Sequence, residues 1–175
     1  KRLIHMELAY KFYLFDPSER TQNELTCWIG PNQKDSLNAK IKKLNDKQFP
    51  LLYHPRTIEI LRELNCNPED ILQKTCFKAQ LFIPANIDRP DFNEINENCI
   101  AGFYYRLEEM NLFKDCKFHI PSKLNWLTLP HTHVEWLNFK DFTKRIERLL
   151  NEERSPLCWL KDKNGNLSKF FVIWW

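Results

Sequence analysis

Glycine is scarce in this chain: the 175 residues include three glycines and ten prolines. The glycines are Gly30, Gly102 and Gly165, and they are far apart in the sequence. A phosphate-binding Walker loop and a dinucleotide-binding fingerprint both need several glycines close together. Their absence excludes nucleotide hydrolysis of the P-loop kind and Rossmann-type hydride transfer.

The cysteines contain no Cys-x-x-Cys pair, and no signal-peptide pattern precedes them. A zinc ribbon or a disulfide framework would need tighter spacing. Free cysteines are usually buried in folded proteins. We therefore expect a cytoplasmic protein with six reduced, mostly buried thiols, at Cys27, Cys66, Cys76, Cys99, Cys116 and Cys158.

The sequence also lacks an apolar run near the ~20 residues of a membrane span, which predicts no membrane association. The net charge of +3 is too small to indicate a nucleic-acid partner by itself. Apolar residues make up 43% of the chain, enough for the core of one α/β domain over residues 1–175. The sequence begins at Lys1, without Met, so we expect a segment upstream of it in the full-length protein.

Residues 3–15 show the clearest pattern. Apolar residues occupy every even position from Ile4 to Leu14, whereas His5, Glu7 and Lys11 occupy odd positions. A period of two predicts a β-strand with its even-numbered face in the core. We expect Tyr10, Phe12 and Leu14 to be buried against a helix.

Further patterns predict a mixed central sheet flanked by helices. Gly30-Pro31-Asn32 should separate a short strand ending near Ile29 from a helix starting near Asp35, and Pro55 and Asn67 should open two more helices. Strands are expected at 77–84 and 117–120, a strand or helix at 100–107, a surface loop at 85–98 and an amphipathic helix at 139–151. Asn164-Gly165 predicts a type I′ turn in a C-terminal β-hairpin of residues 157–173.

The odd-numbered face of the first strand carries candidate chemistry. A metal-dependent nuclease needs acidic ligands for Mg²⁺ or Mn²⁺ and a lysine beside the phosphate. His5 and Glu7 would lie ~7 Å apart, and Lys11 ~13 Å from Glu7, along a regular strand. The alternative is that Glu7 and Lys11 simply form the polar face of a half-buried strand.

Two motifs resemble a known family. The pattern His-x-Glu-Leu-Ala-x-Lys-Phe-Tyr-Leu occurs at residues 5–14, and Trp-x-Gly-Pro-Asn-x-x-Asp-x-Leu at residues 28–37. Together with 81–84 and 170–172, they resemble the bacterial domain-of-unknown-function family numbered eighteen fifty-three. The family-motif residues in the second pattern include Trp28, Gly30, Pro31, Asn32 and Asp35.

This resemblance implies a restriction-endonuclease-like, or PD-(D/E)XK, fold and metal-dependent cleavage of DNA or RNA phosphodiesters. It implies that Glu7 is an acidic metal ligand and Lys11 a displaced catalytic lysine, with the first acid upstream of Lys1. His5 is a further candidate ligand. The alternative function is a nucleic-acid-binding or partner-binding module that has the nuclease-like fold and no activity.

Other polar residues suggest secondary sites. Lys34, Lys40, Lys43 and Lys47 could follow a phosphate backbone, or they could form a solvated helix face. Asn32 and Asp35 could line the site or cap the helix. His131, His133 and Glu135 could include zinc ligands, although Pro130 favours a loop there.

Overall fold

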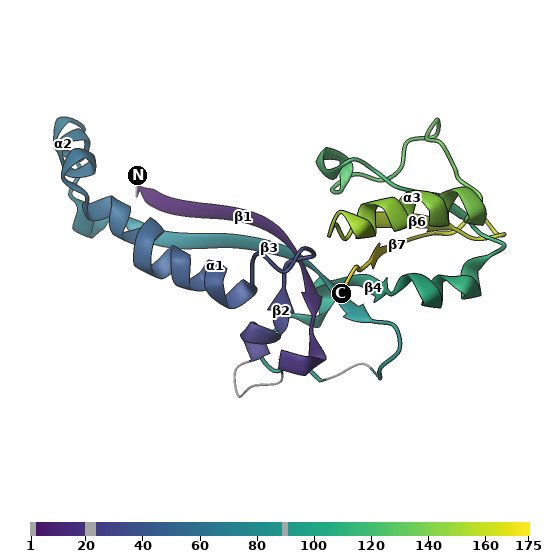
Figure 1. Ribbon diagram of the computed structural model, residues 1–175. Coiled ribbons are helices and arrows are strands. Elements are labelled where there is room, and N and C mark those ends of the chain that lie inside the picture. Colours follow the sequence, from purple (N-terminus) through teal and green to yellow (C-terminus); the bar gives the residue numbers. More distant parts are fainter. Residues whose placement is uncertain (1–2, 20–23, 89–90) are drawn as a thin grey trace.

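The computed structural model describes residues 3–19, 24–88 and 91–175. Their strands form one seven-stranded mixed sheet in the order β2-β1-β3-β4-β7-β6-β5 (Figure 1). The strands are β1 (Ile4–Phe15), β2 (Trp28–Ile29), β3 (Leu72–Pro84), β4 (Ile100–Tyr105), β5 (Lys117–His119), β6 (Leu157–Lys161) and β7 (Leu167–Val172). Strands β1, β3, β4 and β7 are parallel neighbours, and the other pairings are antiparallel. The expected mixed α/β architecture is confirmed.

Helices cover parts of this sheet. The α-helices are α1 (Leu37–Lys43), α2 (Pro55–Glu63) and α3 (Phe139–Asn151), and a π-helical turn, η3 (Leu44–Gln48), continues α1. The 3₁₀ segments are η1 (Pro17–Glu19), η2 (Glu24–Cys27), η4 (Phe49–Tyr53), η5 (Pro68–Asp70), η6 (Glu97–Cys99), η7 (Leu107–Phe113) and η8 (Lys123–Asn125). Pro55 does open a helix, and α3 has the expected bounds.

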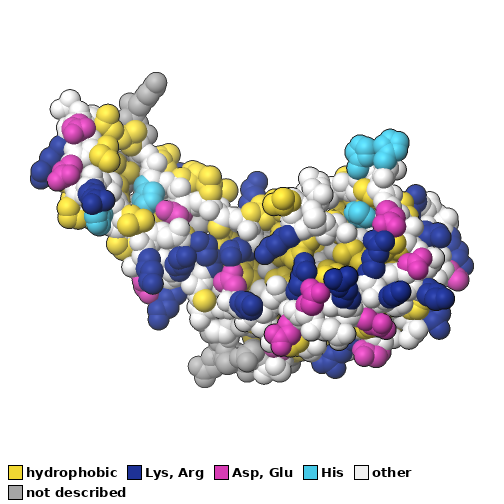
Figure 2. Space-filling view, turned by 45° about the horizontal axis from the view of Figure 1, so that its top comes forward, with side chains coloured by type: hydrophobic (Ala, Val, Ile, Leu, Met, Phe, Trp, Pro, Cys, Tyr) yellow, Lys and Arg dark blue, Asp and Glu magenta, His cyan; other side chains and the backbone are white. Residues whose placement is uncertain are grey.

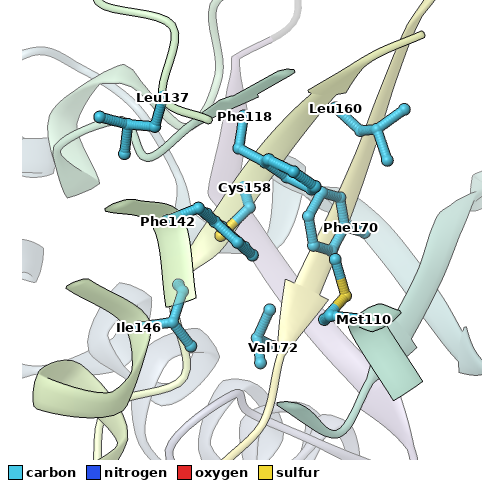
Figure 3. Close-up of a cluster of buried hydrophobic side chains, with 9 residues drawn as sticks. All are labelled: Met110, Phe118, Leu137, Phe142, Ile146, Cys158, Leu160, Phe170 and Val172. Atoms are coloured by element: carbon cyan, nitrogen blue, oxygen red, sulfur yellow. The ribbon is translucent and has the colours of Figure 1, made fainter. Parts of the chain in front are cut away.

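The largest core cluster joins α3 to the C-terminal strands (Figure 3). Phe142 of α3 stacks on Phe118 of β5 with ring centroids 4.1 Å apart, and Phe170 of β7 packs edge-on against both. Ile146, one helical turn after Phe142, is fully buried in the same cluster. The helical spacing of these apolar residues is what attaches α3 to the sheet.

A long two-stranded arm extends from the sheet toward the N-terminal end of the chain (Figure 1). It consists of β1 paired in parallel with β3, from Ile4 opposite Leu72 to Leu14 opposite Phe82. Strand β2 pairs with β1 at Leu14 and Phe15. Beyond those two residues, β1 has no second strand neighbour among the residues placed by the structure.

The burial of this arm corrects one prediction. Leu14 is buried, but Tyr10 is 43% exposed, and Ile4, Met6 and Leu8 are more exposed still. The segment from α1 to η4 covers the opposite face, the one that carries His5 and Glu7. That face can be covered because its polar side chains bond to one another and to the covering segment. We call the uncovered side the open face; it comprises Ile4, Met6, Leu8 and Tyr10 of β1 and Lys74, Cys76 and Lys78 of β3.

Several smaller predictions also need correction. The helix expected at Asn67 is only the 3₁₀ turn η5, because its chain turns directly into β3. The hairpin loop spans residues 162–166, with a left-handed conformation at Gly165 alone, so it is not a two-residue type I′ turn. All six cysteines are thiols outside any disulfide, but only Cys27 and Cys158 are buried. The loop expected at 85–98 includes residues 89–90, which lie outside the described part of the chain.

Within the ranges that the structure describes, no helix has both the length and the apolar composition needed to cross a membrane.

Candidate functional site: a lysine-rich and aromatic cleft

A cleft of about 580 Å³ lies where the arm meets the body of the sheet. Its walls combine lysines, aromatic residues and leucines with the residues of the β2–α1 junction. The lining residues are Tyr10, Lys11, Phe12, Gly30, Pro31, Asn32, Lys34, Asp35, Lys123, Leu124, Trp126 and Leu127. Six residues singled out from the sequence are therefore brought together here, namely Lys11, Gly30, Pro31, Asn32, Lys34 and Asp35.

One wall is the junction between β2 and α1. The amide N–H of Gly30 donates to the Asp35 carbonyl at 2.7 Å, and that of Gln33 donates to the Gly30 carbonyl at 2.8 Å. A Cβ on Gly30 would lie 3.3 Å from the Asp35 Cβ and carbonyl oxygen, which explains the need for a small residue. The predicted strand–junction–helix arrangement is confirmed.

The carboxylate of Asp35 is turned into the cleft. Ser36 caps α1 by accepting a hydrogen bond from the Ala39 amide, so Asp35 is not needed for this role. Its Oδ2 instead lies 2.5 Å from the Lys11 ammonium. About a third of each side chain is exposed, at 38% for Lys11 and 35% for Asp35. The cleft floor thus carries a charge pair within reach of solvent.

Pro31 and Asn32 attach this junction to the C-terminal part of the chain. The Asn32 side-chain oxygen accepts a hydrogen bond from the Ser155 amide at 3.1 Å, and the Pro31 carbonyl accepts one from the Trp175 indole at 3.4 Å. Trp28, the first residue of the same motif, is fully buried against Phe15. These three residues hold the cleft wall in place.

The opposite wall was missed by the sequence reasoning. Trp126 packs edge-on against Phe12, with centroids 5.3 Å apart, and Lys123 holds its ammonium 6.0 Å from the Trp126 ring. The only sequence clue was the i, i+3 spacing of Lys123 and Trp126, which sits in a segment without strong periodicity. Trp126 is only partly buried, so its ring is available at the cleft surface.

Tyr10 closes the cleft on the side of the arm. Its hydroxyl accepts a hydrogen bond from the Gln80 amide at 2.6 Å, and the Gln80 oxygen accepts one from the Lys169 ammonium. Burial lowers the pKa of Lys169 below its usual value. The hydroxyl of Tyr10 is thereby fixed by a chain of polar contacts across three strands.

Glu7 and His5 lie outside the cleft, in a polar network beneath the helical segment. Gln48 of η3 donates to one Glu7 oxygen at 2.6 Å, and His5 Nε2 lies 3.0 Å from the other. Gln73 donates to His5 Nδ1 at 3.0 Å and to the Phe49 carbonyl at 2.7 Å. Since His5 Nδ1 accepts, the proton is on Nε2 and is donated to Glu7.

The four lysines named as candidate nucleic-acid contacts lie in different surroundings. The Lys40 ammonium donates to the Gln48 oxygen at 2.8 Å, inside the polar network. Lys43 and Lys47 are exposed, and Lys34 lies in the cleft. Only Lys34 is therefore placed next to the cleft aromatics.

The residues present do not fit a divalent metal. Over residues 3–19, 24–88 and 91–175, no three His, Cys, Asp or Glu side chains are grouped so that they could hold an ion. Both Glu7 oxygens already accept hydrogen bonds, from His5 and Gln48. In the loop between η8 and α3, Glu135 pairs with Arg145 instead of joining His131 and His133. The metal ligands proposed from the resemblance remain a prediction.

The described residues form a mixed α/β fold with a lysine-rich and aromatic cleft. Residues 1–173 match the model of the family described as domain of unknown function (DUF1853). The chain belongs to this family, as its two N-terminal motifs had suggested. Comparisons with curated proteins and with solved structures each found no significant match.

Proposed function

We propose that the protein binds single-stranded nucleic acid in the cleft. The observation that supports this proposal is the meeting of three lysines, Lys11, Lys34 and Lys123, with the aromatic rings of Tyr10, Phe12 and Trp126. Proteins that bind single strands combine positive charge along the backbone with aromatic rings for the bases. Sequence reasoning had kept such a non-catalytic module as the alternative function.

The charges of the cleft favour an anionic ligand. Three ammonium groups face one carboxylate, that of Asp35, which neutralises only Lys11. Lys34 and Lys123 remain to contact phosphates. Lys123 lies next to the Trp126 ring, so a phosphate on the ammonium would place the adjoining base near the indole. The cleft volume of about 580 Å³ is in the range of small-ligand sites and suits one or two nucleotides.

Fluorescence anisotropy with labelled oligothymidylate and oligouridylate of about 12 nucleotides tests this function. Trp126→Ala should weaken binding by at least about fivefold, since base stacking contributes roughly 1–3 kcal/mol per base. Lys34→Ala should also weaken binding and reduce the salt slope by about 0.7, the value for one phosphate contact on a single strand.

Lys144→Ala is the matched control, because Lys144 is an exposed lysine of α3 that does not line the cleft. It removes the same charge and should leave the affinity and the slope unchanged. Equal affinities for wild type and Trp126→Ala, or an equal loss in Lys34→Ala and Lys144→Ala, would refute binding in this cleft.

A restriction-endonuclease-like relationship and phosphodiester cleavage remain proposals with weaker support. The mixed sheet and the family motifs agree with them, and Lys11 does lie in the cleft. Glu7, however, is held by Gln48 and His5 outside it. We therefore assign no cleavage step to these residues.

A further inference from the structure

The open face of the arm exposes several large apolar side chains in a row. Leu8 is 71% exposed, and Ile4 and Met6 are each nearly half exposed. These residues follow one another at every second position of β1, so they form a band along one face. Figure 2 shows hydrophobic side chains along the arm. A contiguous apolar band on a protein surface usually marks a site of interaction.

Basic side chains border this band on one side. Lys74 and Lys78 of β3 are exposed and lie opposite Met6 and Tyr10 in the sheet register. Neither strand places an acidic residue on this side of the arm. Besides Lys74 and Lys78, the β3 residues on this side are Leu72, Cys76 and Gln80. The face therefore combines an apolar band with an unbalanced positive edge.

We propose that the open face docks an amphipathic helix of a partner protein, with acidic residues along one side of its apolar stripe. The band from Ile4 to Tyr10 covers six residue steps, or ~20 Å, which matches about 13 residues of α-helix. Lys74 and Lys78 are ~13 Å apart along β3 and would face two acidic residues roughly two turns apart on the helix.

Charge and shape select this occupant over others. A second copy docked face to face would bring the lysines of both copies together without acidic partners. A lipid bilayer is flat, whereas the surface of the protein dips between the arm and the opposite end of the molecule (Figure 2). A rod-shaped helix can enter this concave surface. Apart from Tyr10, which it shares with the cleft, the band is aliphatic and offers no further ring for base stacking.

Synthetic peptides of about 18 residues provide the probe, since this length gives five turns of amphipathic helix. The first peptide carries leucines on one helix face with flanking glutamates, and the second has lysines in place of those glutamates. The third has the composition of the first, but its leucines stand at every second position, the pattern of a β-strand. The glutamate-flanked helix should bind at least about tenfold more tightly than either of the others, a difference of about 1.4 kcal/mol.

Variants of the protein then locate the contact. Leu8→Glu should weaken binding of the glutamate-flanked helix by at least about tenfold, whereas Leu112→Glu should not, although Leu112 is 82% exposed on η7. The double change Lys74→Glu and Lys78→Glu should reverse the preference, so that the lysine-flanked helix binds better. All of these side chains are exposed, so folding should be retained, and circular dichroism checks this.

Other outcomes overturn the proposal. Tighter binding of the peptide with leucines at every second position would indicate strand addition to the β1 edge. Dimers in sedimentation that Leu8→Glu dissociates would indicate a second copy. Binding to vesicles of phosphatidylcholine and phosphatidylglycerol that Leu8→Glu abolishes would indicate a membrane surface. Equal affinity of wild type and Leu8→Glu for every peptide would remove the site altogether.

Discussion

Replacing Glu7 by glutamine should destabilise the protein although the two side chains have the same shape. Glu7 is the central acceptor of its network, with a donor on each side, Gln48 and His5. The far ends are also fixed: Lys40 can only donate to Gln48, and the Phe49 carbonyl can only accept from Gln73. A glutamine at position 7 has one accepting oxygen and one donating amide group. In either orientation of this amide, two hydrogen-bond donors of the network face each other without an acceptor between them.

The expected cost follows from these contacts. The Glu7 side chain is 18% exposed, and each hydrogen bond to its carboxylate should contribute roughly 1.5–3 kcal/mol. Glutamine keeps one contact in a weaker, neutral form and loses the other, so Glu7→Gln should cost about 2 kcal/mol in urea unfolding at neutral pH. Glu59→Gln on the exposed surface of α2 should stay within about 0.5 kcal/mol of wild type.

The double variant is the decisive measurement. Lys40→Met removes the donor that fixes the Gln48 oxygen, so Gln48 can turn its amide and accept from glutamine 7. The cost of Glu7→Gln should then fall to about 1 kcal/mol, a coupling of about 1 kcal/mol between the two changes. Additive effects within roughly 0.3–0.5 kcal/mol would refute the directional network. Mn²⁺ calorimetry on the same proteins tests the metal hypothesis, since a Glu7 ligand predicts binding to wild type that Glu7→Gln weakens.

Three further predictions concern the packing. Phe142→Ala should cost about 3–5 kcal/mol in urea unfolding, because Phe142 is fully buried between Phe118 and Phe170, whereas Leu112→Ala should be nearly neutral. Gly102→Ala should lower the unfolding temperature more than Gly30→Ala. The new Cβ would lie 2.4 Å from the Lys169 carbonyl oxygen at position 102, but 3.3 Å from the nearest Asp35 atoms at position 30. An equal shift in the unfolding temperature of both variants would contradict this. Complete burial raises the pKa of the Cys158 thiol, so maleimide should label Cys158 only after unfolding, as peptide mass mapping can show. Labelling of Cys158 as fast as that of the partly exposed Cys66 would contradict the buried position.

The sequence predicted local structure well wherever one periodicity dominated. The alternation in β1, the apolar stripe of α3 and the Gly-Pro-Asn junction all specify backbone conformation through near neighbours. Predictions from short turn motifs were weaker. Asn67-Pro68 starts only the turn η5, and Asp162 extends the hairpin loop by accepting from the Asn164 and Asn166 amides at 2.8 Å. A dipeptide does not determine how far a turn continues, because side chains beyond it also bond to the backbone.

The cleft was predictable only in part. Lys11 and Asp35 belong to motifs visible in the sequence, but their contact at 2.5 Å depends on how β2 and α1 fold back along β1. The opposite wall comes from residues 123–127, more than eighty positions later, and no local pattern links the two walls. Such a site is formed by chain segments that meet only in the folded state.

The sequence by itself determined that residues 4–15 form a strand with one apolar and one polar face. Only the tertiary structure decided which face is covered. Burial of apolar area favours the even-numbered face, but the hydrogen bonds that Gln48 donates to Glu7 and that Gln73 donates to the Phe49 carbonyl attach the helical segment to the odd-numbered one. Alternation determines the two faces of a strand, whereas the partner that packs on each face comes from distant parts of the chain.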